Sequence, residues 1–206
     1  MTRSSLRLLV LCAAAALCAG SAATAKASLL PNLLPSLIGG NCGATSTVFS
    51  PWGDERSYYF TASGGFESGA PGWTLTGGAQ VVPGNDPFYL HGRADNSSLL
   101  LPSGATATSP SLCFGLLDPG LRFVAVSPSG TGSVHVQLVA HGLLGVLSVI
   151  DGGTVQVGST WAPTTVFSTL GSQLDVPVGT KTIQVVLTSS GDVQIDDLYI
   201  DPFLMK

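Results

Sequence analysis

Short apolar runs broken by turn residues constrain the fold of this chain more than any other feature. No segment keeps an apolar period of 3.6 residues over three turns, which excludes a long helix. Asp151-Gly152-Gly153 stands between two apolar runs and predicts a β-hairpin. The runs are rich in Val, Ile, Leu and Phe, and Gly, Pro, Asn, Asp or Ser separate them, as is typical of strands: Ala79–Val82, Leu99–Leu101, Leu121–Ser127, Val134–His141, Gly145–Ile150, Thr154–Val157, Thr182–Thr188 and Val193–Ile200.

Within these runs, apolar and polar residues alternate. In the run from Val134 to His141, Val134, Val136, Leu138 and Ala140 share one face, and the other face carries His135, Gln137, Val139 and His141. Only 10% of the residues are charged, against about 25% in an average soluble domain, so Thr, Ser and Gln must cover the outer faces. The sequence therefore predicts two packed antiparallel sheets, a single β-sandwich domain over residues 49–206.

The N-terminal segment has the features of a secretory signal peptide. Arg3 and Arg7 precede an uncharged apolar run from Leu8 to Ala19, which is too short for a comfortable membrane span, and small residues follow it. We expect cleavage after Ala27 and therefore a secreted protein. A lipoprotein anchored through Cys12 or Cys18 is the alternative, although a leucine precedes each cysteine where lipidation needs a small residue.

The predicted mature chain is acidic and begins with an apolar lead. Without residues 1–27 it has five basic and twelve acidic residues, a net charge of −7. That balance excludes a typical nucleic-acid-binding protein, and no apolar run of 18 residues remains to span a membrane. Residues 28–48 form a Pro- and Gly-rich lead in which Pro31 and Pro35 exclude a long helix. The lead is either a linker or a contact for an envelope partner.

Two cysteines, Cys42 and Cys113, remain after removal of the signal peptide. An even number of cysteines in an oxidising compartment predicts a disulfide, and two buried free thiols are the alternative. Two sulfurs without a neighbouring His pattern do not make a zinc site.

Two motifs resemble the galactose-binding-like jelly rolls, a class that includes several carbohydrate-binding modules. The opening motif is Gly64-Gly65-Phe66-Glu67-Ser68-Gly69 with Gly72-Trp73, and the closing one runs from Ile195 through Asp196-Asp197 to Ile200. They bound a stretch of typical size for that module, Gly64 to Pro202. In addition, Trp52-Gly53-Asp54, with Leu101-Pro102 and Ser109-Pro110, is similar to a group of uncharacterised secreted actinobacterial proteins.

The resemblance implies a structural calcium site. In such modules a Glu of the opening turn and an Asp of the closing strand often bind calcium, which places Glu67 with Asp196 or Asp197. Calcium takes six to eight oxygen ligands. Because neighbouring strand residues point to opposite faces, we expect only one of the two Asp residues to be a ligand. The alternative is that these carboxylates cap turns.

A sugar-binding face would need polar side chains beside an aromatic ring. His135, Gln137 and His141 are the polar candidates on one strand face, and the candidate stacking partners are Trp73, Tyr89, His91 and Trp161. No strand carries a row of aromatics, and Trp73 could equally belong to the core. The two strand histidines could equally lie on a plain solvated face.

Catalysis has little support in the sequence. There is no Gly-x-Ser-x-Gly or His-Glu-x-x-His motif, and Glu55 and Glu67 are the only glutamates. We therefore expect a secreted, non-catalytic module that binds a carbohydrate or a cell-wall polymer and holds structural calcium. The alternatives are a structural cell-envelope protein and, more distantly, a hydrolase that uses Asp54 and Glu55.

Overall fold

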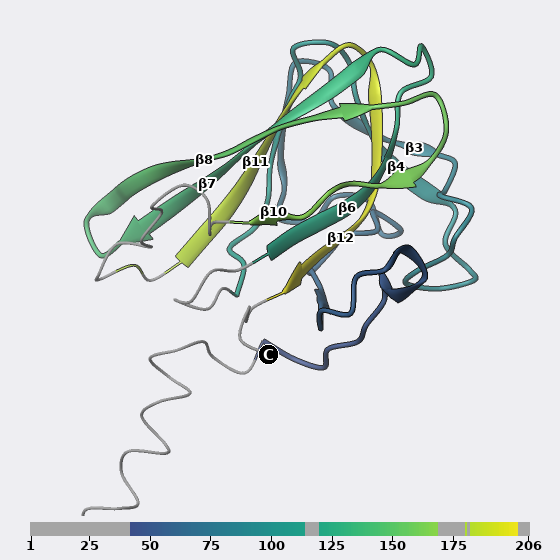
Figure 1. Cartoon of the computed structure of the whole chain (residues 1–206). Coiled ribbons are helices and arrows are strands. Elements are labelled where there is room, and N and C mark those ends of the chain that lie inside the picture. The colour runs from purple at the N-terminus through teal and green to yellow at the C-terminus, as the bar shows by residue number, and fades with distance from the viewer. Residues whose placement is uncertain (1–41, 114–119, 169–179, 181, 202–206) are drawn as a thin grey trace, which may run out of the picture.

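The computed structural model shows two antiparallel β-sheets packed face to face (Figure 1). It describes residues 42–113, 120–168, 180 and 182–201. The predicted signal peptide and most of the apolar lead lie outside this part of the chain. The described residues contain no α-helix, and their single helical element is the 3₁₀ turn η1, Ser50–Trp52. None of their helices has the length and hydropathy to cross a membrane. The prediction of an all-β sandwich is confirmed.

The larger sheet has seven strands in the order β10-β6-β12-β4-β3, with β1 paired to β12 and β9 paired to β6. The smaller sheet has five, in the order β2-β5-β11-β7-β8. The bounds in the larger sheet are β1 Tyr59–Phe60, β3 Gln80–Pro83, β4 Ser97–Leu101, β6 Gly120–Val126, β9 Ala162–Pro163, β10 Phe167–Ser168 and β12 Val193–Asp201. Those in the smaller sheet are β2 Thr74–Thr76, β5 Thr106–Thr108, β7 Gly132–Gly142, β8 Gly145–Val157 and β11 Thr182–Ser190.

The main core lies between the sheets and follows the alternation of the sequence. Every second residue of β7 is buried from Gly132 to Ala140, and β11 shows the same pattern. Strand β6 is instead buried along its whole length. A second, smaller core explains this difference, because Phe49, Tyr58 and Tyr199 pack together beside Arg122, whose guanidinium lies 4.4 Å from the centre of the Phe49 ring.

The predicted hairpin at Asp151-Gly152-Gly153 is wrong. These residues lie inside β8, which pairs with β7 from Gly132 to Gly142, and the turn falls at Leu143-Leu144. The register shifts at the glycines, where Gly152 approaches the Val136 carbonyl so closely that a Cβ would lie 3.0 Å from its oxygen. The two glycines therefore make a β-bulge, a use of glycine that resembles a turn in the sequence.

Residues 42–48, assigned to the lead from the sequence, contact the sandwich. The backbones of Ser46 and Tyr58 exchange two hydrogen bonds of 2.8 and 2.9 Å. The predicted disulfide between Cys42 and Cys113 is confirmed, with a Cα–Cα distance of 5.5 Å. It fixes the start of the described chain beside Leu112, which bridges to Ile183 of β11.

We predict that the double variant Cys42→Ser/Cys113→Ser loses about 4 kcal/mol of unfolding free energy, because the bridge closes a loop of 71 residues in the unfolded chain. Urea denaturation of the two proteins, followed by circular dichroism, measures the difference. The serine pair keeps the size of the side chains and avoids a free thiol. Equal urea midpoints would show that the bridge does not stabilise the fold.

Candidate functional site

The opening and closing motifs of the chain meet at a bulge in β12. The register of β12 against β6 shifts between Asp196 and Tyr199, and Asp197 has a left-handed backbone, φ 50°. The Leu198 carbonyl accepts hydrogen bonds from the backbone N–H and the hydroxyl of Thr61, and the Leu198 N–H donates to the carbonyl of Gly64. A Cβ on Gly64 would lie 2.9 Å from the Leu198 oxygen, so this contact requires glycine.

The bulge turns both aspartates to the same face of β12, away from the main core, where residues 84–96 cover them. Asp196 is 0% exposed and Asp197 is 1% exposed. The alternation rule, which predicted opposite faces for these neighbours, fails here because the left-handed residue interrupts the pleat. Gly65 lies directly above Asp197, where a Cβ would come within 3.3 Å of Oδ1. Gly64 therefore makes room for the Leu198 carbonyl, and Gly65 makes room for the Asp197 carboxylate.

The two buried carboxylates hold the backbone of the loop between β3 and β4, residues 84–96. Asp196 Oδ2 accepts a hydrogen bond of 3.2 Å from the Asp86 N–H, and Asp197 Oδ2 accepts one of 3.2 Å from the His91 N–H. Asp86 is itself fully buried, and its Oδ1 accepts a hydrogen bond of 2.7 Å from the Phe88 N–H within the loop. Three acidic residues thus attach a long loop to the closing strand.

The buried acidic residues lack a compensating cation among the described residues, where no Lys or Arg forms an ion pair with them. Asp86 Oδ2 and Asp197 Oδ1 receive no hydrogen bond from any N–H group of those residues. Burial also raises the pKa of the Asp86 carboxyl. Burial and then the Asp197 charge raise the pKa of Asp196 to about 8, and burial and then the Asp86 charge raise the pKa of Asp197 to about 8.

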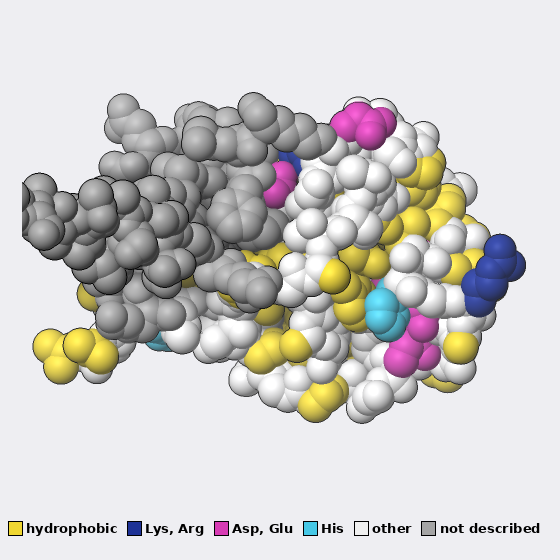
Figure 2. Space-filling view, turned by 90° about the horizontal axis from the view of Figure 1, so that it is seen from below, with side chains coloured by type: hydrophobic (Ala, Val, Ile, Leu, Met, Phe, Trp, Pro, Cys, Tyr) yellow, Lys and Arg dark blue, Asp and Glu magenta, His cyan; other side chains and the backbone are white. Residues whose placement is uncertain are grey.

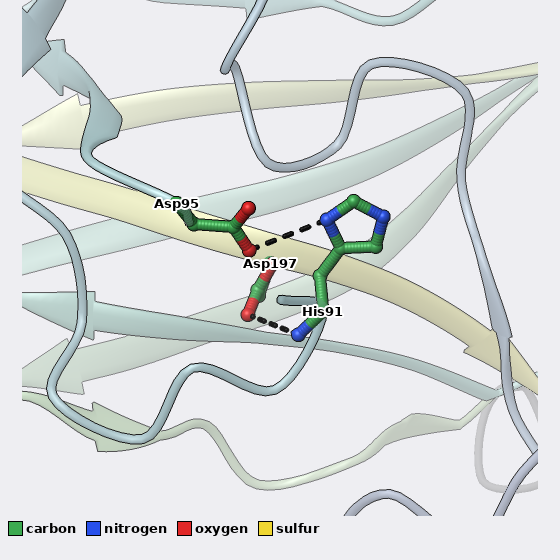
Figure 3. A group of neighbouring side chains, drawn as sticks. All are labelled: His91, Asp95 and Asp197. Atoms are coloured by element: carbon green, nitrogen blue, oxygen red, sulfur yellow. Dashed lines mark hydrogen bonds and ion pairs between the residues drawn. The ribbon is translucent and has the colours of Figure 1, made fainter. Parts of the chain in front are cut away.

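His91, Asp95 and Asp197 form a group whose ligand atoms all lie within 4.8 Å of one another (Figure 3). The His91 Nδ1 is 3.3 Å from Asp95 Oδ2, and the His91 ring stacks on Phe60 with centroids 3.9 Å apart. The structure therefore brings Asp197 together with His91 and Asp95, and Glu67 and Asp196 are not members of this group. Glu67 is exposed, and its Oε1 accepts the N–H groups of Asn96 and Ser97.

The same loop exposes aromatic rings beside the acidic residues. Trp52, Phe88 and Tyr89 are 39, 37 and 47% exposed. The Trp52 and Phe88 rings meet edge to face with centroids 4.9 Å apart, and Trp52 also contacts the buried Phe49 ring at 6.3 Å. We call these three exposed residues the aromatic platform. In the view from below, hydrophobic side chains and a His lie next to acidic side chains (Figure 2).

The other predicted sugar ligands lie elsewhere. Trp73 is buried in the main core against Phe66, so it cannot stack on a ligand. His135, Gln137 and His141 lie half-buried on the outer face of the five-stranded sheet, where His135 Nδ1 pairs with Thr154 Oγ1 at 3.1 Å. Trp161 is half-buried just before β9. Of the predicted ligands, only Tyr89 and His91 belong to the loop that carries the platform.

Asp54, the residue considered for hydrolysis, is committed to structural bonds. Its Oδ2 accepts hydrogen bonds of 2.7 Å from the Tyr58 hydroxyl and 2.8 Å from the Arg122 guanidinium. Its Oδ1 accepts a hydrogen bond of 3.1 Å from the Arg56 N–H. Burial alone would raise the pKa of Asp54, but these hydrogen bonds outweigh it and lower the pKa. Asp54 thus fixes Arg122 beneath Phe49 and supports the platform from below.

Sequence reasoning missed Trp52, Phe88, Asp86 and Asp95 as members of the site. The signal was the length of the segment between the runs at Ala79–Val82 and Leu99–Leu101. A connection this long between strands is unusual and is often functional. This one carries both acidic and aromatic residues.

No protein-family model and no curated protein sequence matches the chain. Among solved structures, the enzymatically active domain of bacteriophage CBA120 tailspike protein 4 is similar, at 16% identity and a TM-score of 0.51 over 69% of this chain and 21% of that one. The chain thus spans about a fifth of the tailspike's length, and the likeness shows a common fold.

Two modules, one of Xyn10B and one of Xyn10C, are also similar. The C-terminal family 22 carbohydrate-binding module of Clostridium thermocellum Xyn10B has 16% identity and a TM-score of 0.46 over 70% of this chain and 96% of that one. The CBM22-2 xylan-binding domain of Paenibacillus barcinonensis Xyn10C has 12% identity and a TM-score of 0.47 over 68% of this chain and 98% of that one.

We predict that the melting temperature, measured in chelator, falls as the pH rises from about 4 to about 8. The folded-state pKa of Asp196 and that of Asp197 lie above their unfolded values, so their stabilisation is complete below the unfolded pKa and is lost as pH rises through the folded one. Asp197→Asn should flatten this slope, whereas Asp151→Asn, at an exposed position, should leave it unchanged. A wild-type melting temperature that rises over this range would contradict the raised pKa values.

Proposed function

We propose that the chain is a secreted, non-catalytic module that binds a carbohydrate, such as a cell-surface glycan, on the aromatic platform. The observation that carries the proposal is the exposure of three aromatic rings on one loop and one turn, held from below by a buried core. Apolar rings with a few polar groups at their edges are typical of small-ligand sites. A pyranose ring presents C–H groups for stacking and hydroxyls for hydrogen bonding.

The polar groups that the proposal needs lie on the loop that carries Phe88 and Tyr89. The Tyr89 hydroxyl and the exposed ring of His91 can bond to sugar hydroxyls, and neither requires a charged ligand. Because the His91 N–H and the Phe88 N–H are both bonded to buried carboxylates, the loop is ordered before a ligand arrives. A preordered site loses less conformational entropy on binding.

We further propose that a divalent cation, calcium in the first place, binds at the acidic residues beneath the loop. The unpaired buried oxygens of Asp86 and Asp197, with the Asp95 carboxylate nearby, suit a hard cation that takes oxygen ligands. Both oxygens of Asp196 already accept backbone hydrogen bonds. The ring nitrogen of His91 is the one donor of the group that would favour zinc or another transition metal.

The disulfide and the β-sandwich agree with an extracellular location, where oxidising conditions preserve such bridges. Secretion through residues 1–27 and similarity to secreted actinobacterial proteins remain expectations from the sequence.

Trp52→Ala and Tyr89→Ala should each weaken glycan retention roughly tenfold or more, because each removes a ring from the platform. Affinity electrophoresis in gels that contain soluble polysaccharides, after a glycan array has found a ligand, measures the change. His135→Ala, on the outer face of the five-stranded sheet, is the matched control. Loss of retention in the control alone would move the site to that face, and no retention on any glycan would overturn the proposal.

Calcium should raise the melting temperature of the metal-free protein at pH 8, and a chelator should reverse the rise. A ligand at a hundredfold excess over its Kd stabilises by about 2.7 kcal/mol. Asp197→Asn should abolish the response, and Asp151→Asn should keep it. Stabilisation by zinc but not by calcium would contradict a calcium site and assign the group to a transition metal through His91.

A further inference from the structure

The hairpin of β7 and β8 projects from the sandwich and ends in uncharged aliphatic side chains (Figure 1). Leu143 and Leu144 at its turn are 86 and 102% exposed, and Val146, Leu147 and Val149 are also exposed. We call these five residues the hairpin patch. Residues 136–150 contain no Asp, Glu, Lys or Arg. Hydrophobic side chains project at the left edge of the view from below, at the same end as the hairpin (Figure 2).

The hairpin patch has apolar groups on both faces of the hairpin. The register slips by one residue between Ala140 and His141, so Leu147 is the extra residue of a bulge. Leu147 lies over Gly142, where a Cβ would come within 2.9 Å of its Cδ1 atom. The bulge and the missing Cβ of Gly142 therefore leave apolar side chains on both faces of the hairpin. Exposure of these side chains to water is unfavourable.

Strand β8 is also the last strand of its sheet. Among the described residues it pairs with β7 alone, so its other backbone edge is not used by any strand of that part of the chain. A long edge strand with exposed apolar side chains is a template for pairing with another strand. A partner must therefore supply both a strand edge and an uncharged apolar surface.

We propose that β8 pairs with the β8 strand of a second copy, with the hairpin patch at the centre of a two-fold dimer interface. A second copy offers the same free edge and the same apolar groups, and two-fold symmetry makes the two surfaces self-complementary. Antiparallel pairing across the axis would join two five-stranded sheets into one continuous sheet.

Two other occupants fit the patch less well. The hydrocarbon core of a bilayer offers no hydrogen-bonding groups to an open strand edge, and an anionic surface repels a chain whose net charge is −7 without residues 1–27. The chain's own apolar lead, residues 28–40, contains Pro31 and Pro35. Proline has no N–H group to donate and fixes its own backbone angle, so this segment makes a poorer strand partner than β8, which contains no proline.

The dimer does not depend on the proposed glycan binding. The hairpin lies at the opposite end of the molecule from β3 and β4, whose connecting loop carries Phe88 and Tyr89 (Figure 1). Both aromatic platforms would therefore stay free in the dimer. Two linked sites raise avidity for a repetitive polymer without any new contact.

Sedimentation velocity of the full secreted chain over a concentration series tests the proposal. The wild type should dimerise, and Leu147→Lys and Val149→Lys should each raise the dimer Kd roughly a hundredfold, because symmetry brings two like charges into the interface. Gln156→Lys adds the same charge to the same strand outside the hairpin patch and should leave the dimer intact. Thermal melts by circular dichroism establish that all variants are folded.

A wild type that is monomeric up to about 1 mM would overturn the proposal, and co-sedimentation of that monomer with phosphatidylcholine vesicles would make lipid the occupant. A dimer that persists in both Leu147→Lys and Val149→Lys would also overturn it, since the interface would then lie elsewhere.

Discussion

The bulge in β12 is the constraint on which the site depends. A regular strand would place Asp197 on the opposite side from Asp196, and one of the two carboxylates could then not bond to the loop. The left-handed backbone at Asp197 turns both toward the loop, and the carbonyl of Gly64 fixes the bulge by accepting a hydrogen bond from the Leu198 N–H. Strain at a residue without glycine's freedom persists only where its surroundings hold it in place. Here the opening glycines and the loop together provide that restraint.

Burial of three carboxylates has a cost that the rest of the site must offset. An isolated charge in a dry interior is unfavourable, so the group either binds protons or holds a cation. The raised pKa values of Asp196 and Asp197 describe the first state. The divalent cation proposed at Asp86 and Asp197 would take the place of bound protons, and the Oδ2 atom of Asp197 would stay on the His91 N–H. Either state preserves the N–H bonds that order the loop, so the aromatic platform depends on chemistry beneath it.

The sequence predicted the fold well because burial imposes a period of two on the strands. The alternation at Val134, Val136 and Leu138 fixed both the strand and its inner face. It failed at Gly152-Gly153 and at Asp196-Asp197, the two places where a bulge breaks the period. A bulge depends on what the partner strand and the neighbouring loop do, and local residue preferences do not report that.

The site was harder to predict than the fold because its residues come from separate parts of the chain. The resemblance of the opening and closing motifs pointed to Asp197, but not to its neighbours His91 and Asp95. Trp52 reaches Phe88 only because η1 packs on the second core through Phe49. Such contacts depend on long-range packing. The available sequence signal was a long loop that combined acidic and aromatic residues, which indicates a site without naming its geometry.

The two exposed apolar regions differ in chemistry, and that difference argues for two kinds of partner. Tyr89 and Trp52 combine a flat ring with a polar atom, so they can contact a ligand that keeps part of its hydration shell. The side chains of Leu143, Leu144 and Leu147 have no polar atom, so only a contact that excludes water stabilises them. In a chain with so few charged groups, large apolar side chains on the described surface still gather at these two ends. The aliphatic end therefore fits the proposed dimer, and the aromatic end fits the proposed glycan site.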